Sequence, residues 1–126
     1  MQFNERDLSL LYDIYECCDL ITKFTNDVKF FQYEKDIKIR LQIERLFEIV
    51  GQASKQISHE TQEKLHNIQW KKMIGMRNIL AHDYGEIRND KVWNATQQSI
   101  PELLVELKKI DELMAHIKND TRYFSS

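Results

Sequence analysis

The chain has 126 residues, enough for one domain with its own hydrophobic core, and we predict a single domain over residues 1–126. Charged residues make up 30% of the chain and apolar residues 42%, with three glycines and one proline, a composition that favours long helices and excludes a low-complexity chain. The formal net charge of −2 argues against a protein that holds nucleic acid by bulk electrostatics, but it permits a local basic site.

The amino-terminal part predicts a first helix, capped by Asn4 or Asp7. Its apolar stripe alternates between spacings of four and three residues and consists of Leu10, Ile14, Cys17, Ile21 and Phe24. Residues 25–33 break this pattern. We predict that they connect two helices and that their aromatic side chains pack into the core. Cys17 and Cys18 are adjacent, which disfavours a disulfide between them, so we expect reduced core residues.

A second helix is predicted from about Tyr33. Its stripe again alternates between spacings of four and three residues and consists of Ile39, Ile43, Leu46, Val50, Ala53 and Ile57. Gly51 lies beside the stripe, where a stronger helix former would be worth up to ~1 kcal/mol, so we predict that it lets another backbone come close. Glu44 and Glu48 lie one turn apart on a flank. They are candidates to pair with Arg77, although either could be an ordinary surface carboxylate.

A short helix is predicted from Ser58 to about His66, and a further helix begins at about Ile68. The apolar positions of the further helix share one side, and they are Trp70, Met73, Ile74 and Leu80. Arg77 falls in the same stripe. Either a carboxylate from a neighbouring helix neutralises this guanidinium, or the guanidinium is held at the base of a cleft to bind a phosphate.

His82 follows Arg77 by five residues, which places the two side chains about 140° apart around a helix and so on different faces. They can converge if the helix loosens near Ala81, which Gly85 as a C-terminal stop permits, or if a second copy of the chain supplies one of them. Within residues 71–91, five basic residues stand against three acidic ones, which makes a modest basic patch around these positions.

The last predicted helix is long and is capped by Asn89 or Asp90. Its apolar positions keep a three–four alternation almost to the end of the chain. Pro101 interrupts the backbone hydrogen bonding without shifting this stripe. We therefore predict a kink or a short break there, with Ser99 or Ile100 capping the second half.

The predicted helices give an all-α fold class, an up-and-down bundle of four main helices plus a short helix, which dimerises. Residues 119–126 lose the helical periodicity and are predicted to fray. No apolar run approaches the ~20 residues that a membrane-spanning helix needs, and the amino terminus has no signal-peptide pattern. We therefore expect a soluble, cytoplasmic protein.

Residues 77–84 read Arg-Asn-Ile-Leu-Ala-His-Asp-Tyr, which resembles the Arg-x-x-x-x-His-x-Tyr signature of the HEPN superfamily, specifically its HepT-like toxin branch. The similarity covers roughly residues 5–118. Its context includes Arg40–Arg45, Ile49–Ala53, Gln69 with Trp70, and Val92 with Trp93. Gln52 departs from the family pattern, which usually has an acid in an Ile-Gly-Glu-Ala run.

Metal-independent RNA cleavage needs a base for the ribose 2′-hydroxyl, an acid for the leaving oxygen and a cation on the phosphate. An imidazole with an ordinary pKa near ~6.5 transfers protons at neutral pH, so His82 is the candidate general acid or base. Arg77 would hold the scissile phosphate bidentately, with Asn78 and Asp83 as supporting residues. Attack by the 2′-hydroxyl leaves a 2′,3′-cyclic phosphate as the expected product.

The resemblance implies a dimeric endoribonuclease acting on tRNA or mRNA, the toxin of a type VII-like toxin–antitoxin system. It also implies that Tyr84 accepts AMP from ATP, transferred by a partner minimal nucleotidyltransferase that serves as the antitoxin in a hetero-oligomer. An adenylate on this tyrosine would add bulk and negative charge where the RNA phosphate must lie.

Other functions have weaker support in the sequence. His59, His66 and His116 lack carboxylate or cysteine neighbours at ligand spacing, so we predict no metal site and no cofactor for cleavage. Two alternatives stay open. One is a non-catalytic helical interaction module in which Arg77 forms a buried salt bridge, and the other is a nucleotide-binding subunit of a nucleotidyltransferase complex.

Overall fold

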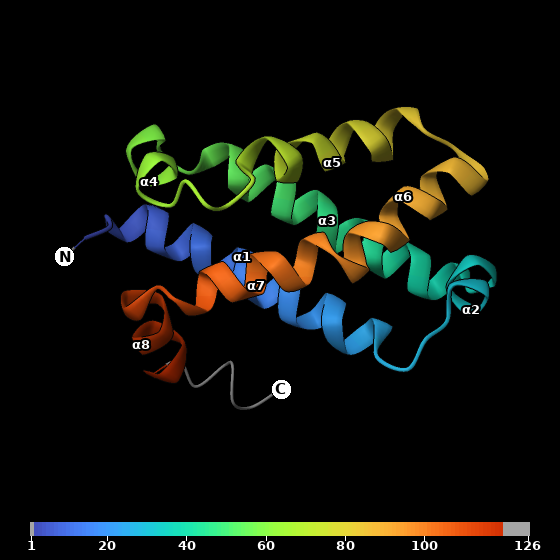
Figure 1. The fold of residues 1–126 in the computed structure, drawn as a ribbon, viewed down its shortest axis with the longest axis horizontal. Coiled ribbons are helices and arrows are strands. Elements are labelled where there is room, and N and C mark those ends of the chain that lie inside the picture. Colours follow the sequence, from blue (N-terminus) through green and yellow to red (C-terminus); the bar gives the residue numbers. More distant parts are fainter. Residues whose placement is uncertain (1, 120–126) are drawn as a thin grey trace.

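A computed structural model describes residues 2–119, which fold into eight helices without a strand (Figure 1). The helices are α1 (Glu5–Thr25), α2 (Phe30–Lys35), α3 (Ile37–Gln56), α4 (His59–Lys64), α5 (Trp70–His82), α6 (Gly85–Gln97), α7 (Ser99–Lys108) and α8 (Asp111–Asn119). The predicted all-α class is confirmed. Residues 120–126, most of the segment predicted to fray, lie outside the described residues.

The main helices form a four-helix bundle in which α6 and α7 together act as the fourth member. Helix α3 packs between α1 and α5, while α6 packs against α5 and α7 packs against α1. The members alternate in direction along the long axis (Figure 1). This confirms the predicted up-and-down bundle of four main helices. Two short helices, α2 and α4, lie at its ends where one was predicted.

The single long helix predicted for the last part of the chain is divided at two places. The predicted break near Pro101 is confirmed, but the N-cap residue of α7 is Gln98, which makes no side-chain capping hydrogen bond. Pro101 is the third residue of α7, where a missing N–H costs no intrahelical hydrogen bond. The second break, between α7 and α8 at Lys109 and Ile110, was not predicted. Ile110 stays buried, so the apolar spacing runs through the break and conceals it.

The segment predicted as a connection contains α2. The Tyr33 ring is buried and lies 5.2 Å from the Trp93 ring of α6, and the Phe30 ring lies 6.2 Å from the same indole. These contacts confirm that aromatic side chains of this segment pack into the core. The second main helix then begins at Ile37, with Asp36 as its N-cap, rather than at Tyr33.

The core contains most of the predicted stripes, with both cysteines inside it. Cys17 and Cys18 are free and buried, as predicted. Burial raises the pKa of the Cys17 thiol to about 12, so the reactive thiolate is scarce at neutral pH. Of the first stripe, Phe24 stays 37% exposed. No helix among residues 2–119 combines the length and apolar character that crossing a membrane requires.

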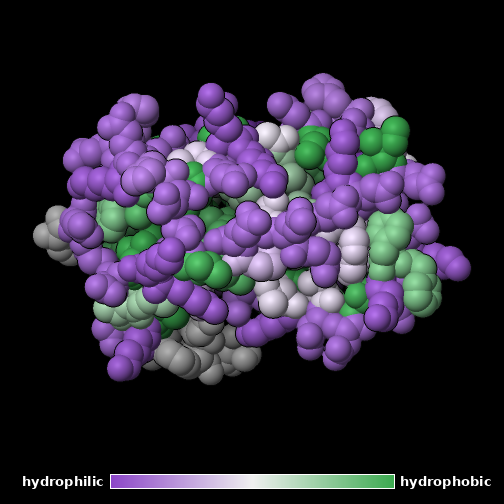
Figure 2. Space-filling model, viewed as in Figure 1, coloured by the Kyte–Doolittle hydropathy of each residue, from purple (hydrophilic) through white to green (hydrophobic). Residues whose placement is uncertain are grey.

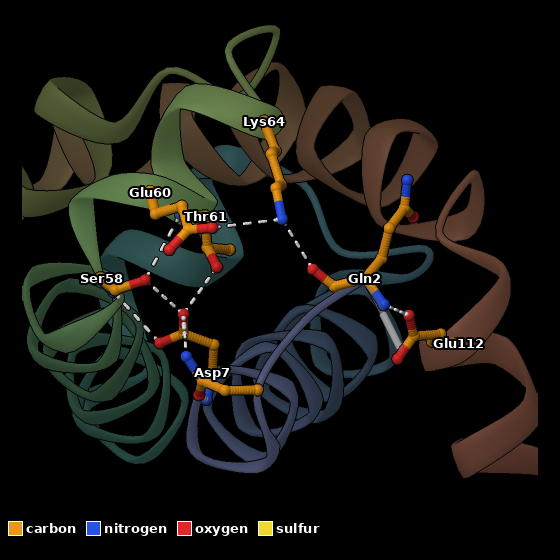
Figure 3. A network of polar contacts seen from close by, with 8 residues as sticks. Gln2, Asp7, Ser58, Glu60, Thr61, Lys64 and Glu112 are labelled. Carbon is orange, nitrogen blue, oxygen red and sulfur yellow. Dashed lines mark hydrogen bonds and ion pairs between the residues drawn. The ribbon is translucent and has the colours of Figure 1, made fainter.

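A buried carboxylate ties α1 to α4 (Figure 3). Asn4 caps α1 by accepting a hydrogen bond from the Asp7 backbone N–H at 2.7 Å, which settles the choice between the two predicted caps. Asp7 is 2% exposed and accepts hydrogen bonds from the Ser58 hydroxyl at 2.5 Å and the Thr61 hydroxyl at 2.6 Å. Its carboxylate also accepts from the Ser58 backbone N–H at 3.1 Å and the Asn4 amide at 3.1 Å. Every one of these donors favours the ionised acid.

Candidate active site

Helix α5 turns to the core a face that only partly matches the prediction, because Trp70 and Met73 of the predicted stripe are buried whereas Ile74 and Leu80 are half-buried. Trp70, Met73 and Met76 are its buried residues, whereas Arg77 is exposed. The prediction of Arg77 on a core-facing stripe is therefore wrong, because Met76 occupies the inward position and Arg77, 100° further around the helix, lies on the flank. The reading of Arg77 as a buried salt bridge, on which the non-catalytic alternative depended, loses its basis.

Arg77 rests in a notch formed by Gly51 of α3. A Cβ atom at position 51 would lie 2.8 Å from Cγ of Arg77 and 3.2 Å from the Met73 carbonyl oxygen, both closer than ordinary contact distance. The predicted use of Gly51 is confirmed, because its lack of a side chain lets the backbone of α5 approach α3. The same notch accommodates the aliphatic part of the Arg77 side chain.

Arg77 lines two neighbouring hollows in the surface. The first has a volume of about 480 Å³ and lies between α3 and α5, with Lys55 and Asn78 in its lining. The second has a volume of about 410 Å³ and extends over α3 towards α1, with Arg45 in its lining. Glu48 contributes to both. Arg77 therefore stands where an anion entering either hollow would meet it, and Asn78 lines the first of them.

Neither glutamate predicted to pair with Arg77 does so. Glu44 pairs with Arg88 of α6 instead, with 3.2 Å between Oε1 and Nη2. Glu48 lies 3.6 Å from Arg45 in an exposed pair along α3. None of the ion pairs among residues 2–119 involves Arg77, so its charge is available to a ligand.

His82 is the last residue of α5 and is exposed. The helix stays regular through Ala81, so the predicted loosening that would bring His82 towards Arg77 is wrong. His82 lies outside both hollows that Arg77 lines. Of the two predicted ways to bring these groups together, only the second copy of the chain is left.

The chain passes from α5 into α6 in a tight corner. Asp83 is the C-cap residue of α5 and Tyr84 the N-cap residue of α6. Gly85 has φ +58°, the left-handed region that glycine adopts without strain. Gly85 thus opens α6 rather than ending α5, and the predicted caps Asn89 and Asp90 lie inside α6.

The two polar residues of this corner have different surroundings. Tyr84 is 73% exposed, so its phenol is reachable from solvent. Asp83, predicted to support the site, forms an ion pair with Lys91 of α6 at 2.7 Å. Its carboxylate therefore joins the two helices that meet at the corner.

Arg88 is a residue that the sequence reasoning missed. Its Nη2 contacts Glu44 of α3, and its Nη1 donates to the Leu80 carbonyl oxygen at 3.4 Å. One guanidinium thereby joins α3, α5 and α6 beside the corner. The available signal was weak, since it consisted of an arginine one turn after Tyr84 in a segment that also carries Lys91.

Exposed apolar side chains lie near both members of this ion pair in sequence. Leu41 lies one turn before Glu44 and is 59% exposed, as is Ile37 one turn earlier, while Ile87, next to Arg88, is 60% exposed. Figure 2 shows apolar surface at the end of the molecule where α5 passes into α6. We call Ile37, Leu41 and Ile87 the apolar corner.

Comparison with known proteins identifies the family of this chain. The family model described as "Ribonuclease HepT-like" matches residues 14–110, which include the Gly51 notch, both catalytic candidates and Tyr84. The chain belongs to the HepT-like ribonuclease family. Membership supports a ribonuclease function for this HepT-like protein and agrees with the all-α bundle. No solved structure shows significant similarity to the chain.

Curated relatives of this HepT-like chain carry names of the same kind. The Methanocaldococcus jannaschii protein "Putative RNase MJ1380" is 34% identical over 106 residues, covering 83% of this chain and 97% of the relative. "Putative RNase MJ1216" of the same organism is 34% identical over 107 residues, covering 84% and 88%. "Probable ribonuclease HepT" of Thermococcus cleftensis is 32% identical over 100 residues, covering 79% and 91%.

Proposed function

We propose that this protein is a metal-independent endoribonuclease acting on tRNA or mRNA, with Arg77 and His82 as its catalytic residues. The observation that carries the proposal is the position of Arg77, an exposed guanidinium without an ion-pair partner among the described residues, between two open hollows. A bidentate guanidinium is well suited to a phosphodiester and to the charge that builds on it during cleavage. The family of the chain supports RNA as the substrate.

In the proposed reaction the ribose 2′-oxygen attacks the neighbouring phosphorus and loses its proton to a base. The 5′-oxygen of the next nucleotide leaves and takes up a proton, so that a 2′,3′-cyclic phosphate and a free 5′-hydroxyl result. An exposed imidazole with access to solvent can act in either proton transfer. His82 has this character, and Arg77 holds the non-bridging oxygens of the phosphate.

The proposed reaction requires two copies of the chain. Arg77 and His82 lie on different faces of a regular helix, so a two-fold dimer would bring two such pairs into one cleft. The apolar corner supports this arrangement, because Ile37, Leu41 and Ile87 expose large aliphatic side chains to solvent. A second copy covering these side chains would remove them from water.

We further propose that cleavage is silenced by AMP attached to Tyr84. A cognate minimal nucleotidyltransferase, the antitoxin of a type VII-like system, would transfer adenylate from ATP to the phenol oxygen and release pyrophosphate. The 73% exposure of Tyr84 supports this proposal, because an acceptor hydroxyl must enter the active site of the other enzyme. The bulk and charge of the adenylate would then exclude the RNA phosphate.

The test of cleavage uses purified wild-type protein with total tRNA and mRNA in EDTA. We expect cleavage to fragments ending in 2′,3′-cyclic phosphate, and a loss of about a hundredfold or more in His82→Ala and Arg77→Ala. His66→Ala, which changes another exposed histidine, is the matched control and should cleave normally. Intact RNA with the wild type, or equal cleavage by His82→Ala, would refute the proposal.

A further inference from the structure

We propose that Arg88 and Glu44 are positioning residues that hold the α5–α6 corner, and with it His82 and Tyr84, in the geometry that cleavage needs. The inference rests on the proposed function and extends it to residues outside the Arg-x-x-x-x-His-x-Tyr signature. Arg88 follows that signature on α6, and Glu44 lies on α3, far from it in sequence.

The contact between Arg88 and Leu80 fixes the last turn of α5. The final carbonyl groups of a helix have no partner within the helix. At this end the Ile79 carbonyl accepts from the Asp83 backbone N–H at 3.0 Å, and the Leu80 carbonyl accepts from Nη1 of Arg88 at 3.4 Å. His82 follows Leu80 by two residues. The backbone conformation at His82 therefore depends on the hydrogen bonds that these last carbonyl groups accept.

The contact between Arg88 and Glu44 anchors the same guanidinium to the centre of the bundle. The Glu44 side chain is 16% exposed and the Arg88 side chain 26%, whereas the Arg45–Glu48 pair of α3 is exposed at 68% and 54%. Shielding from water strengthens the pair and limits the rotamers of both side chains. The planar guanidinium reaches two acceptors at once, which a lysine ammonium on a flexible stem does less rigidly.

The side chains at the corner have few contacts of their own. Among residues 2–119, no hydrogen bond or ion pair holds the side chain of His82 or of Tyr84. Their positions therefore follow from the backbone of residues 80–85, which Arg88 ties to α3 and the Asp83–Lys91 pair ties to α6. Of these two ion pairs, only the one between Arg88 and Glu44 reaches α3 at the centre of the bundle.

The test compares Arg88→Lys and Glu44→Gln with wild type in RNA cleavage. We expect kcat to fall roughly ten- to hundredfold with KM nearly unchanged, because Arg77 stays in the Gly51 notch while the position of His82 is no longer fixed. The double variant should be no slower than either single variant, because both remove one link. Unchanged kcat in both single variants would overturn the proposal.

Matched controls separate positioning from general loss of stability. Glu106→Gln breaks the pair between Lys109 and Glu106 at the end of α7, whose glutamate is 22% exposed, and Arg6→Lys makes the same chemical change at an exposed position of α1. Both should keep wild-type kcat. The exchange Glu44→Arg with Arg88→Glu rebuilds the ion pair and should recover part of the lost rate. If kcat in Arg88→Lys and Glu44→Gln falls no further than kcat in Glu106→Gln, the proposal is contradicted.

A second readout does not require RNA cleavage at all. Amide hydrogen exchange of residues 81–84 should accelerate about tenfold or more in Arg88→Lys, while exchange in the centre of α1 stays unchanged. If wild-type protein fails to cleave RNA but this local acceleration occurs, the proposed function fails and the anchoring role of Arg88 stands. Unchanged exchange at residues 81–84 would overturn the anchoring role itself.

Discussion

Two polar clusters tie helices together at opposite ends of the bundle, and they differ in what surrounds them (Figure 1). At the α4 end, Asp7 is 2% exposed and its partners are hydroxyl and amide groups. At the α5–α6 corner, Arg88 and Glu44 are half-buried, and His82 and Tyr84 of the same corner are exposed. We expect the first cluster to serve stability alone. The second leaves its neighbours open to solvent, as chemistry on a large substrate requires.

The largest expected effect comes from breaking the first cluster. Asp7→Ala leaves the hydroxyls of Ser58 and Thr61 without their acceptor and should lower the free energy of unfolding by about 3 kcal/mol. Urea denaturation measures this loss. RNA cleavage per folded molecule should stay at the wild-type level. Asp19→Ala, which breaks a pair with Lys23 whose lysine is 63% exposed, is the control and should change stability by less than about 1 kcal/mol.

The same cluster predicts a defined response to acid. Burial raises the pKa of Asp7, but hydrogen bonds from Ser58, Thr61 and Asn4 outweigh burial and hold the pKa below its ordinary value. A carboxyl whose pKa is lower in the folded state stabilises fully above its unfolded pKa of ~3.9, and the contribution disappears as the pH falls through the folded value. Thermal melts of Asp7→Asn should therefore lose less stability than wild type between about pH 5 and pH 2. If wild type and Asp7→Asn lose the same stability as the pH falls, the lowered pKa of Asp7 is contradicted.

A smaller change in stability with a large change in activity is expected at the Gly51 notch. In Gly51→Ala the new Cβ would meet Cγ of Arg77 at 2.8 Å and should displace the arginine, at a cost of about 1–2 kcal/mol. Cleavage should fall at least about tenfold. Gly75→Ala is the matched control, because nothing lies within 4 Å of its Cβ position. It should stabilise α5 by up to about 1 kcal/mol and cleave normally.

The smallest effect on stability is expected at Tyr84. Tyr84→Phe removes only an exposed hydroxyl, so the free energy of unfolding should change by less than about 0.5 kcal/mol and RNA cleavage should persist. On co-expression with the nucleotidyltransferase, intact-mass measurement should find whole AMP increments on wild type and none on the variant. AMP increments that persist in Tyr84→Phe would place the modification elsewhere.

Patterns within one helix were predictable from the sequence. The Asn4 cap and most of the buried stripes of α1 and α3 follow from local spacing and residue type. Each depends on neighbours one or two turns away, which the sequence displays directly.

Contacts that depend on how helices are rotated against each other were not predictable. Met76 and Arg77 differ by one position, and only the packing of α5 on α3 decides which of them faces inward. Glu44 and Arg88 are 44 positions apart in the sequence, so the apolar periodicity of either helix does not predict that they pair. The break at Lys109 was concealed for a different reason, since apolar spacing continues on both sides of it.

The central claim, that Arg77 and His82 act together across a two-fold axis, is tested most directly by mixing two inactive variants. Arg77→Ala and His82→Ala chains carrying different affinity tags are co-expressed, and the mixed dimers are verified by tandem purification. Unfractionated mixtures should recover about a quarter of wild-type cleavage, because half of randomly formed dimers are mixed and each retains one intact pair. A mixture of Arg77→Ala with the Arg77→Ala/His82→Ala double variant should stay inactive. If the first mixture is as inactive as either variant alone, the two residues do not meet across the dimer and the account is wrong.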